Sequence, residues 1–149
     1  RYYVVDGEEV QRICDGIRVT RKPFRYNWYF NVVKPMLDGW CMFLDDDDEL
    51  RSEPKNPGSD TNKMFLYKVN IAGRVVPNDQ NFGGKPVLND ISGLSVVFHS
   101  SEMVDWRPQR GGDYDFISEM HAKCHVVWVN RILSATQTGG NNGNRKDLD

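Results

Sequence analysis

The sequence predicts an α/β fold in which helices pack on a largely parallel sheet. One observation is a helical period, in which apolar residues fall on one helix face at positions 29, 32, 33, 36 and 37. A strand-like run at 17–20 precedes this segment, and the wholly apolar run 40–44 follows it. Strand, helix and strand in succession are typical of a right-handed βαβ unit. The length of 149 residues indicates one domain with a hydrophobic core.

The N-terminal half contains three further signals. Residues 2–5 are β-branched and aromatic and are followed by a turn sequence, which predicts a strand, and residues 8–14 predict a short helix. Pro35 lies inside the helical pattern and lacks a backbone N–H, so we expect the helix to kink or end there. The run 40–44 carries no polar side chain, which favours a strand in the middle of a sheet.

The C-terminal half alternates apolar segments with loops rich in Gly, Pro and Asn. The apolar segments predict strands at 64–71, 74–76, 94–99 and 126–129. A helix is predicted over 110–120, where Asp113 lies near the N-cap and can accept a backbone N–H. Residues 138–149 have almost no apolar content, so we expect a single domain over 1–137 and a flexible Gly- and Asn-rich tail after it.

Charge and cysteine content limit which partners and which cellular compartment we expect for this protein. The formal net charge is −2, but without the five consecutive acids at 45–49 the same count gives +3, so the acidity is local and we expect no nucleic-acid partner. The three cysteines are an odd number without paired spacing, which favours a reducing compartment. No apolar stretch approaches the roughly 18 residues of a membrane span, and no signal peptide is visible. We expect a cytoplasmic protein, with peripheral attachment to a membrane left open.

The five acids begin where an apolar strand would end. In open α/β sheets, ligands bind beyond the carboxyl ends of the strands. Because side chains alternate along a strand, Asp45 and Asp47 would point to one side, and Asp46 and Asp48 to the other. Two carboxylates with this D-x-D spacing can converge on one Mg²⁺ or Mn²⁺ ion, both of which prefer oxygen ligands. The alternative is an acidic turn that only keeps a loop solvated.

Three motifs occur in a set order along the chain. They are an Asn-bearing helix at 26–31, the run G-W-C-M-F-L-D-D-D-D at 39–48, and G-D-Y-D-F at 112–116. In this order they resemble the family 2 glycosyltransferases of the GT-A fold, in which a strand ends in F-L-D-x-D-D and a later E-D or G-D pair opens a helix. The resemblance covers roughly residues 2–130. It implies a GT-A-type, Rossmann-like, mixed and largely parallel sheet flanked by helices.

The resemblance also implies an activity and roles for the acids. It implies a hexosyltransferase that depends on Mn²⁺ or Mg²⁺ and moves a sugar from a UDP- or GDP-sugar to a glycan or other hydroxyl acceptor, with inversion. Asp45 matches the first acid of the D-x-D motif, near the ribose and the metal, and Asp47 matches the acid that binds the cation. Asp46 is expected to contact the nucleotide-sugar, with Asp48 in support. Asp113 matches the acid that acts as general base in inverting members.

Further contacts to the nucleotide-sugar are expected outside these acids. Asn27 and Asn31 both fit the family's helix position, and we assign the contact to Asn27. Asp6 stands where the family has a second strand that ends in D-D-G-S, so the family's first strand is expected to lie upstream of this chain. In the Gly-rich tail, Arg145 and Lys146 can supply positive charge to phosphates, with plain disorder as the alternative.

Two other classes of function stay open. One is a non-catalytic carbohydrate- or Ca²⁺-binding module, in which the acids form a calcium loop and Trp106 and Trp128 stack on a sugar. The other is a nucleotidyltransferase, which shares the α/β sheet and the metal chemistry but needs a Gly-rich phosphate loop after its first strand.

Overall fold

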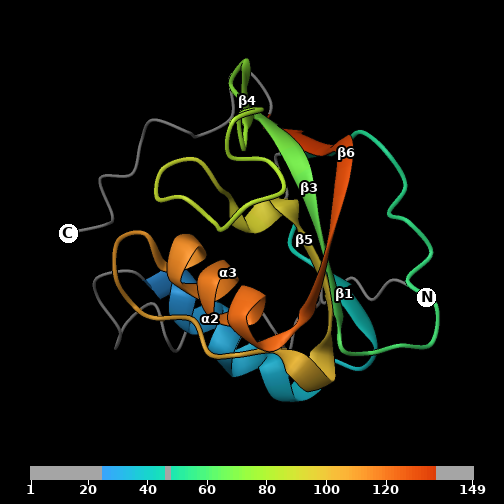
Figure 1. Cartoon of the computed structure of the whole chain (residues 1–149). Helices are drawn as coiled ribbons and strands as arrows, with labels where there is room; N and C mark the ends of the chain where they lie inside the picture. Colours follow the sequence, from blue (N-terminus) through green and yellow to red (C-terminus); the bar gives the residue numbers. More distant parts are fainter. Residues whose placement is uncertain (1–24, 46–47, 137–149) are drawn as a thin grey trace.

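The computed structural model describes residues 25–45 and 48–136, which form a mixed α/β unit (Figure 1). The helices are α2 (Arg25–Val33) and α3 (Gly112–Lys123), with 3-10 turns η1 (Lys34–Met36), η2 (Gly93–Ser95) and η3 (Ser100–Glu102). The strands are β1 (Trp40–Met42), β2 (Asp48–Leu50), β3 (Lys63–Ile71), β4 (Arg74–Val76), β5 (Val96–His99) and β6 (His125–Thr136). The strands predicted at 2–5 and 17–20, the helix at 8–14 and the tail at 138–149 lie outside the described residues.

The strands form one mixed sheet in the order β1-β5-β3-β6-β2, with β4 paired to β3. Only β3 and β6 run parallel among the described strands, and the other four pairs are antiparallel. The prediction of a mixed α/β fold is confirmed, whereas the prediction of a largely parallel sheet is wrong. β3 has a nearly continuous buried pattern because both of its faces are covered, and such a pattern does not reveal strand direction.

The region around α2 and β1 agrees in part with the sequence. α2 ends at Val33, and Pro35 lies in the 3-10 turn that follows, as predicted from the missing N–H of proline. The apolar run 40–44 does form a strand, but it is shorter than predicted and not central. Within the described part of the chain β1 pairs with β5 alone, so it lies at one end of the strand order.

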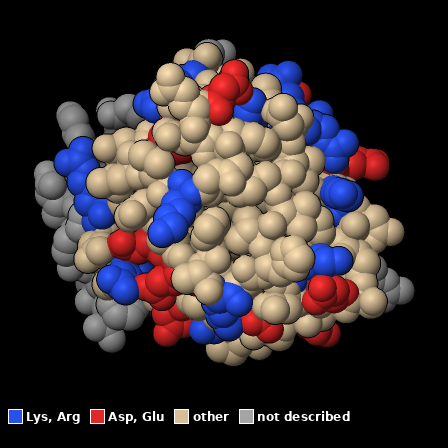
Figure 2. Space-filling model, viewed as in Figure 1, with Lys and Arg blue, Asp and Glu red and all other residues tan. Residues whose placement is uncertain are grey.

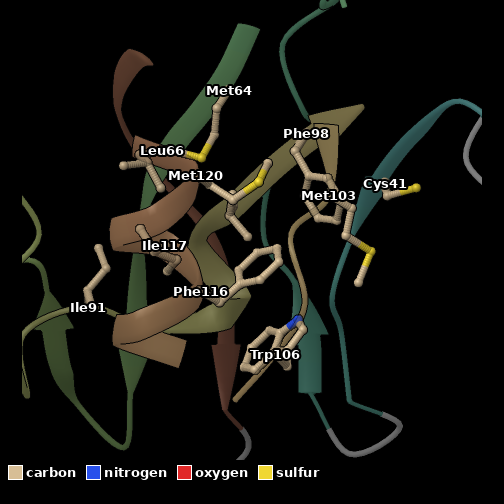
Figure 3. Close-up of a cluster of buried hydrophobic side chains, with 11 residues drawn as sticks. Cys41, Met64, Leu66, Ile91, Phe98, Met103, Trp106, Phe116, Ile117 and Met120 are labelled. Carbon is tan, nitrogen blue, oxygen red and sulfur yellow. The ribbon is translucent and has the colours of Figure 1, made fainter. Parts of the chain in front are cut away.

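One face of the sheet carries the main core, beneath α2 and α3 (Figure 1). From α3, Phe116, Ile117 and Met120 point toward the sheet and are at most 1% exposed (Figure 3). They pack against side chains of β3 and β5, namely Met64, Leu66, Val96 and Phe98. Burial of these large apolar side chains fixes where α3 lies on the sheet.

The other face carries a smaller cluster built around Phe65, Tyr67 and Val97. The loop after β2 covers part of it, because the Tyr67 hydroxyl accepts the backbone N–H of Lys55 at 2.7 Å. In the described ranges both α-helices lie on the first face, so flanking by helices is limited to that face.

The surface carries charges of both signs. Figure 2 shows acidic and basic side chains mainly around the edge of one face of the molecule, whose middle is largely uncharged. Some of them pair between segments distant in sequence, such as Lys34 with Asp105 at 2.7 Å and Lys123 with Glu102 at 3.2 Å. Among the described residues there is no helix of the length and apolar character that crossing a membrane requires.

Candidate active site

The acidic run follows β1 at the end of a short non-strand segment. Asp45 is exposed, and its carbonyl accepts the backbone N–H of Asp48 at 3.1 Å, which closes a turn. Asp48 then begins β2, which pairs with the last residues of β6 through Asp48 and Thr136. Asp46 and Asp47, the second and third acids of the run, lie outside the described residues. β1 ends at Met42, three residues before Asp45, so the strand that was predicted to continue to the first acid stops earlier.

The start of α3 places Asp113 in the first helical turn. The N-cap is Gly111, whose φ of 79° lies in the left-handed region that glycine adopts at little cost. Asp113 lies two residues after this cap, in the first turn of the helix, which agrees with the predicted position near the N-cap. The backbone N–H of Tyr114 donates to Asp113 Oδ1 at 2.9 Å, which orients the carboxylate.

An aromatic cluster joins these two segments. Phe43, two residues before Asp45, has its ring centroid 5.2 Å from that of Trp106 and 5.6 Å from that of Phe116. Trp106 and Phe116 stack with centroids 4.7 Å apart and an interplanar angle of 14°. Figure 3 shows these two rings next to each other at the start of α3. The acidic run and Asp113, 68 positions apart in the sequence, therefore extend from the same group of side chains.

Helix α2 contributes Phe30 to this cluster. Its ring lies 4.5 Å from Phe43 and 4.6 Å from Trp106, centroid to centroid. The two asparagines on either side of Phe30 contact the loop that leads to α3. Asn27 Nδ2 donates to the carbonyl of Arg107 at 2.6 Å, and Asn31 exchanges two hydrogen bonds with the backbone of Trp106. Asn27 was predicted to contact the nucleotide-sugar. In the structure its side chain donates hydrogen bonds to the loop before α3.

Two glycines allow close packing around Asp113. A Cβ on Gly93 would lie 2.9 Å from the Trp106 ring and 3.7 Å from the Cβ of Asp113. A Cβ on Gly112 would overlap the side-chain nitrogen of Asn27 and lie 2.8 Å from the carbonyl oxygen of Arg107. Sequence reasoning missed both positions. The doubled glycine before Asp113 was the available signal, because glycine often marks a close approach of backbone.

The donor chemistry of the acidic run fits a hard divalent cation. Carboxylate oxygens are the ligands that Mg²⁺ and Mn²⁺ prefer. Asp45 is exposed, whereas Asp48 is half-buried and its Oδ2 is buried. Within 25–45 and 48–136 no three His, Cys, Asp or Glu side chains gather closely enough to hold a metal, and Asp47, the predicted ligand, lies outside these ranges. Asp6, Arg145 and Lys146 lie outside them as well.

Two tryptophans considered as a sugar platform have other partners. Trp106 is 5% exposed and belongs to the core cluster. Trp128 is half-buried and makes an edge contact with Phe82 at 5.1 Å between ring centroids. The face of Trp106 is therefore inaccessible to a sugar ring.

An open pocket of about 490 Å³ lies between β2, β3 and β6. Its two arginines already have partners: Arg51 pairs with Glu49 at 3.0 Å, and Arg131 donates to the carbonyl of Glu53 at 2.6 Å. None of the predicted site residues that the structure describes lines it, and the lining residues are Arg51, Ser52, Asn70, Arg131, Ile132 and Ala135.

Comparison with known proteins found no match to this chain among protein-family models, curated proteins or solved structures.

Proposed function

We propose that the chain is a metal-dependent glycosyltransferase of the GT-A type, which moves a sugar from a UDP- or GDP-sugar to a hydroxyl acceptor with inversion. The observation that carries the proposal is the aromatic cluster, because Phe43 precedes the acidic run and contacts the rings of Trp106 and Phe116, which come before and after Asp113 in the sequence. The three motifs of the family pattern thus converge, since α2 packs on the same cluster through Phe30.

The acids divide into two roles under this proposal. Asp45 and Asp47 hold Mn²⁺ or Mg²⁺, with Asp46 and Asp48 beside them. When bound, the cation neutralises negative charge that builds on the departing nucleoside diphosphate. The chain's own contribution is to present adjoining carboxylates in a turn that is open to solvent at Asp45.

Asp113 takes the role of general base. Its carboxylate accepts the proton of the acceptor hydroxyl while that oxygen forms a bond to the anomeric carbon. The bond from the same carbon to the diphosphate oxygen breaks, and the electron pair leaves with the diphosphate. The hydrogen bond from Tyr114 N–H to Asp113 Oδ1, at 2.9 Å, supports this role because a base must be held in a fixed orientation.

Calorimetric titration with UDP and GDP, each with and without Mn²⁺, tests the metal and nucleotide site. We expect Mn²⁺-dependent binding of at least one nucleotide, and weaker binding in Asp45→Asn. Asp60→Asn is the matched control, because Asp60 is an exposed acid whose Oδ1 accepts the N–H of Asn62, and an asparagine oxygen can do the same. Absence of metal-dependent binding to both nucleotides would contradict the proposal.

Product analysis with a panel of sugar nucleotides tests the reaction. Asp113→Asn should lower kcat by about 10²- to 10⁴-fold, the usual contribution of a general base, with little change in nucleotide affinity. Unchanged turnover in this variant would remove Asp113 from the role.

The alternative of a carbohydrate- or Ca²⁺-binding module makes a different prediction. It requires Ca²⁺ binding without nucleotide and no effect of Asp113→Ala on ligand affinity. The burial of Trp106, which is 5% exposed, weighs against it, because one of its two proposed sugar-stacking residues is inside the core.

A further inference from the structure

We propose that Asn27 and Asn31 are positioning residues that hold the loop before α3 and thereby set the position of Asp113 in the first turn of this helix. The catalytic consequence rests on the function proposed above, whereas the structural consequence can be measured without it. The proposal gives Asn27 a different role from the nucleotide contact that the family resemblance implies. It is carried by four hydrogen bonds between α2 and the loop before α3.

Asn31 binds the backbone of Trp106 in both directions. Its Nδ2 donates to the Trp106 carbonyl at 2.8 Å, and the Trp106 backbone N–H donates to Asn31 Oδ1 at 2.6 Å. A side-chain amide presents one donor and one acceptor side by side, so it can pair with the N–H and the C=O of one residue, as a neighbouring strand would. The ring of Trp106 is buried, and this pairing satisfies the backbone at the same residue.

Asn27 lies one helical turn before Asn31, on the same face of α2. Its Nδ2 donates to the carbonyls of Arg107 at 2.6 Å and Gln109 at 3.2 Å. One NH₂ group has two protons, so both of its donors are used by the loop. The Asn27 amide therefore has no donor left for a phosphate or ribose oxygen while these bonds persist.

The loop passes this constraint to α3 through short-range contacts. The carbonyl of Gln109, which accepts from Asn27, also accepts the N–H of Gly112 at 3.2 Å. The side chain of Gln109 donates to Asp115 Oδ2 at 2.5 Å, in the first turn of α3. Gly112 is buried directly against Asn27, where a Cβ would overlap the amide nitrogen. Asp113 follows immediately, so a shift at residue 109 moves the carboxylate.

The same helix also reaches the acidic run. Phe30, between the two asparagines, contacts Phe43 and Trp106 with ring centroids 4.5 and 4.6 Å apart. α2 therefore touches the residues before Asp45 by aromatic packing and the residues before Asp113 by hydrogen bonds. One rigid element sets the position of both acids, which is how a site gains preorganisation.

The first experiment separates positioning from nucleotide binding by using Asn27→Asp, which keeps the size but replaces two donors with an oxygen that repels the Arg107 and Gln109 carbonyls. We expect kcat to fall about a hundredfold, the usual cost of a misplaced group, while the Kd for UDP or GDP with Mn²⁺ stays within about twofold. Asn130→Asp is the control, because Asn130 is exposed on β6. A rise in nucleotide Kd of about tenfold in Asn27→Asp would make Asn27 a ligand and overturn the proposal. Unchanged kcat would overturn it as well.

The second experiment needs no enzymatic activity. Hydrogen exchange of backbone amides, followed by NMR, reports on the Trp106 N–H, whose acceptor is Asn31 Oδ1. Asn31→Ala should speed its exchange about tenfold, and Asn31→Asp, which keeps an acceptor oxygen but places its second oxygen against the Trp106 carbonyl, should restore part of the protection. In Asn27→Ala the Gly112 amide should exchange faster. If the wild-type protein shows neither nucleotide binding nor turnover, the proposed function fails and this exchange decides the positioning role alone. Equal exchange in all four proteins would overturn it.

Discussion

The start of α3 and the acidic turn after β1 pack on the same aromatic cluster but are held in different ways. Side-chain amides from α2 and the close contact at Gly112 hold the backbone that leads to Asp113. The acidic turn is held by a backbone bond between Asp45 and Asp48 and by the pairing of β2 with β6. Leu44, which precedes the turn, is 43% exposed.

Under the function proposed above, this difference matches two different chemical needs. A general base must be fixed against its proton donor, because a small misplacement costs much of the rate. A group of carboxylates that binds a cation must instead stay accessible to water and phosphate, because Mg²⁺ and Mn²⁺ keep part of their shell for them. We therefore expect mutations around Asp113 to affect folding strongly and mutations in the acidic turn to affect it little. Four measurements of the free energy of unfolding test this contrast.

The largest effect should come from Phe116→Ala. Phe116 is 1% exposed and stacks on Trp106, and its ring also contacts Phe43. Its removal should lower the free energy of unfolding in urea by about 3–5 kcal/mol, because the cavity cannot close around rigid aromatic neighbours. Val75→Ala, on the exposed side of β4, should cost far less. A loss below about 1 kcal/mol at Phe116 would mean that the cluster does not anchor α3.

The next effect should come from Gly112→Ala. The added methyl would overlap the Asn27 nitrogen and lie 2.8 Å from the Arg107 carbonyl oxygen, so α2 and the loop must separate. We expect a loss of about 1–3 kcal/mol, as for other overpacked sites. Gly84→Ala is the control, since its Cβ would meet only the Asn81 carbonyl oxygen at 3.5 Å. Equal stability of the two variants would disprove the close packing at residue 112.

A third effect concerns Asp90, whose loop supports the start of α3 from the other side. Leu88, two residues earlier, would lie 3.3 Å from a Cβ on Gly111. Burial alone would raise the pKa of Asp90, which is 4% exposed. Hydrogen bonds from Asn81 and the Asn78 N–H, and the charge of Arg74, outweigh burial and lower the pKa below its ordinary value.

The lowered pKa gives Asp90 a pH dependence with a defined sign. A carboxyl group with a lower pKa in the folded state stabilises the protein above its unfolded value of about 3.9 and loses that contribution as the pH falls through the folded value. Asp90→Asn should therefore cost about 1–2 kcal/mol at pH 7, and the difference from wild type should shrink below about pH 4. Asp79→Asn, at a side chain that is 93% exposed, should show little of this dependence. A pH-independent difference would contradict the charged network.

Local features of the fold were predictable from the sequence, and pairing between distant segments was not. The proline at 35, the hairpin strands β3 and β4, and the helix after the doubled glycine follow from local chemistry and are present. β6 was predicted only over 126–129 because a polar pair, Asn130 and Arg131, interrupts the apolar run. The strand register shows how the strand continues past this pair. Tyr67 of β3 is opposite Val129 and Lys68 is opposite Ile132, so the polar pair forms a bulge within one long strand.

For the candidate site too, the sequence pointed to individual residues but not to their partners in distant segments. The order of motifs predicts Asp45 and Asp113 as site residues, and in the structure Phe43 and Phe116, which lie two and three positions from them in the sequence, are in contact. It could not identify the partners of Asn27 and Asn31, because their hydrogen bonds join residues 75 to 82 positions apart. An asparagine on a helix face looks the same in sequence whether it binds a ligand or a loop.

The smallest effect on the free energy of unfolding should come from Asp45→Asn, in the acidic turn after β1. Asp45 is exposed, so solvent screens both the repulsion from neighbouring acids and any attraction that its charge makes. We expect the free energy of unfolding without metal to change by less than about 0.5 kcal/mol. Millimolar Mn²⁺ should raise the Tm of the wild-type protein and raise that of the variant less, because a ligand stabilises the state that binds it. If Asp45→Asn instead destabilised the metal-free protein as much as Gly112→Ala, the acidic turn would be as firmly built as the start of α3. The contrast between an accessible acidic turn and a firmly held start of α3 would then be disproved.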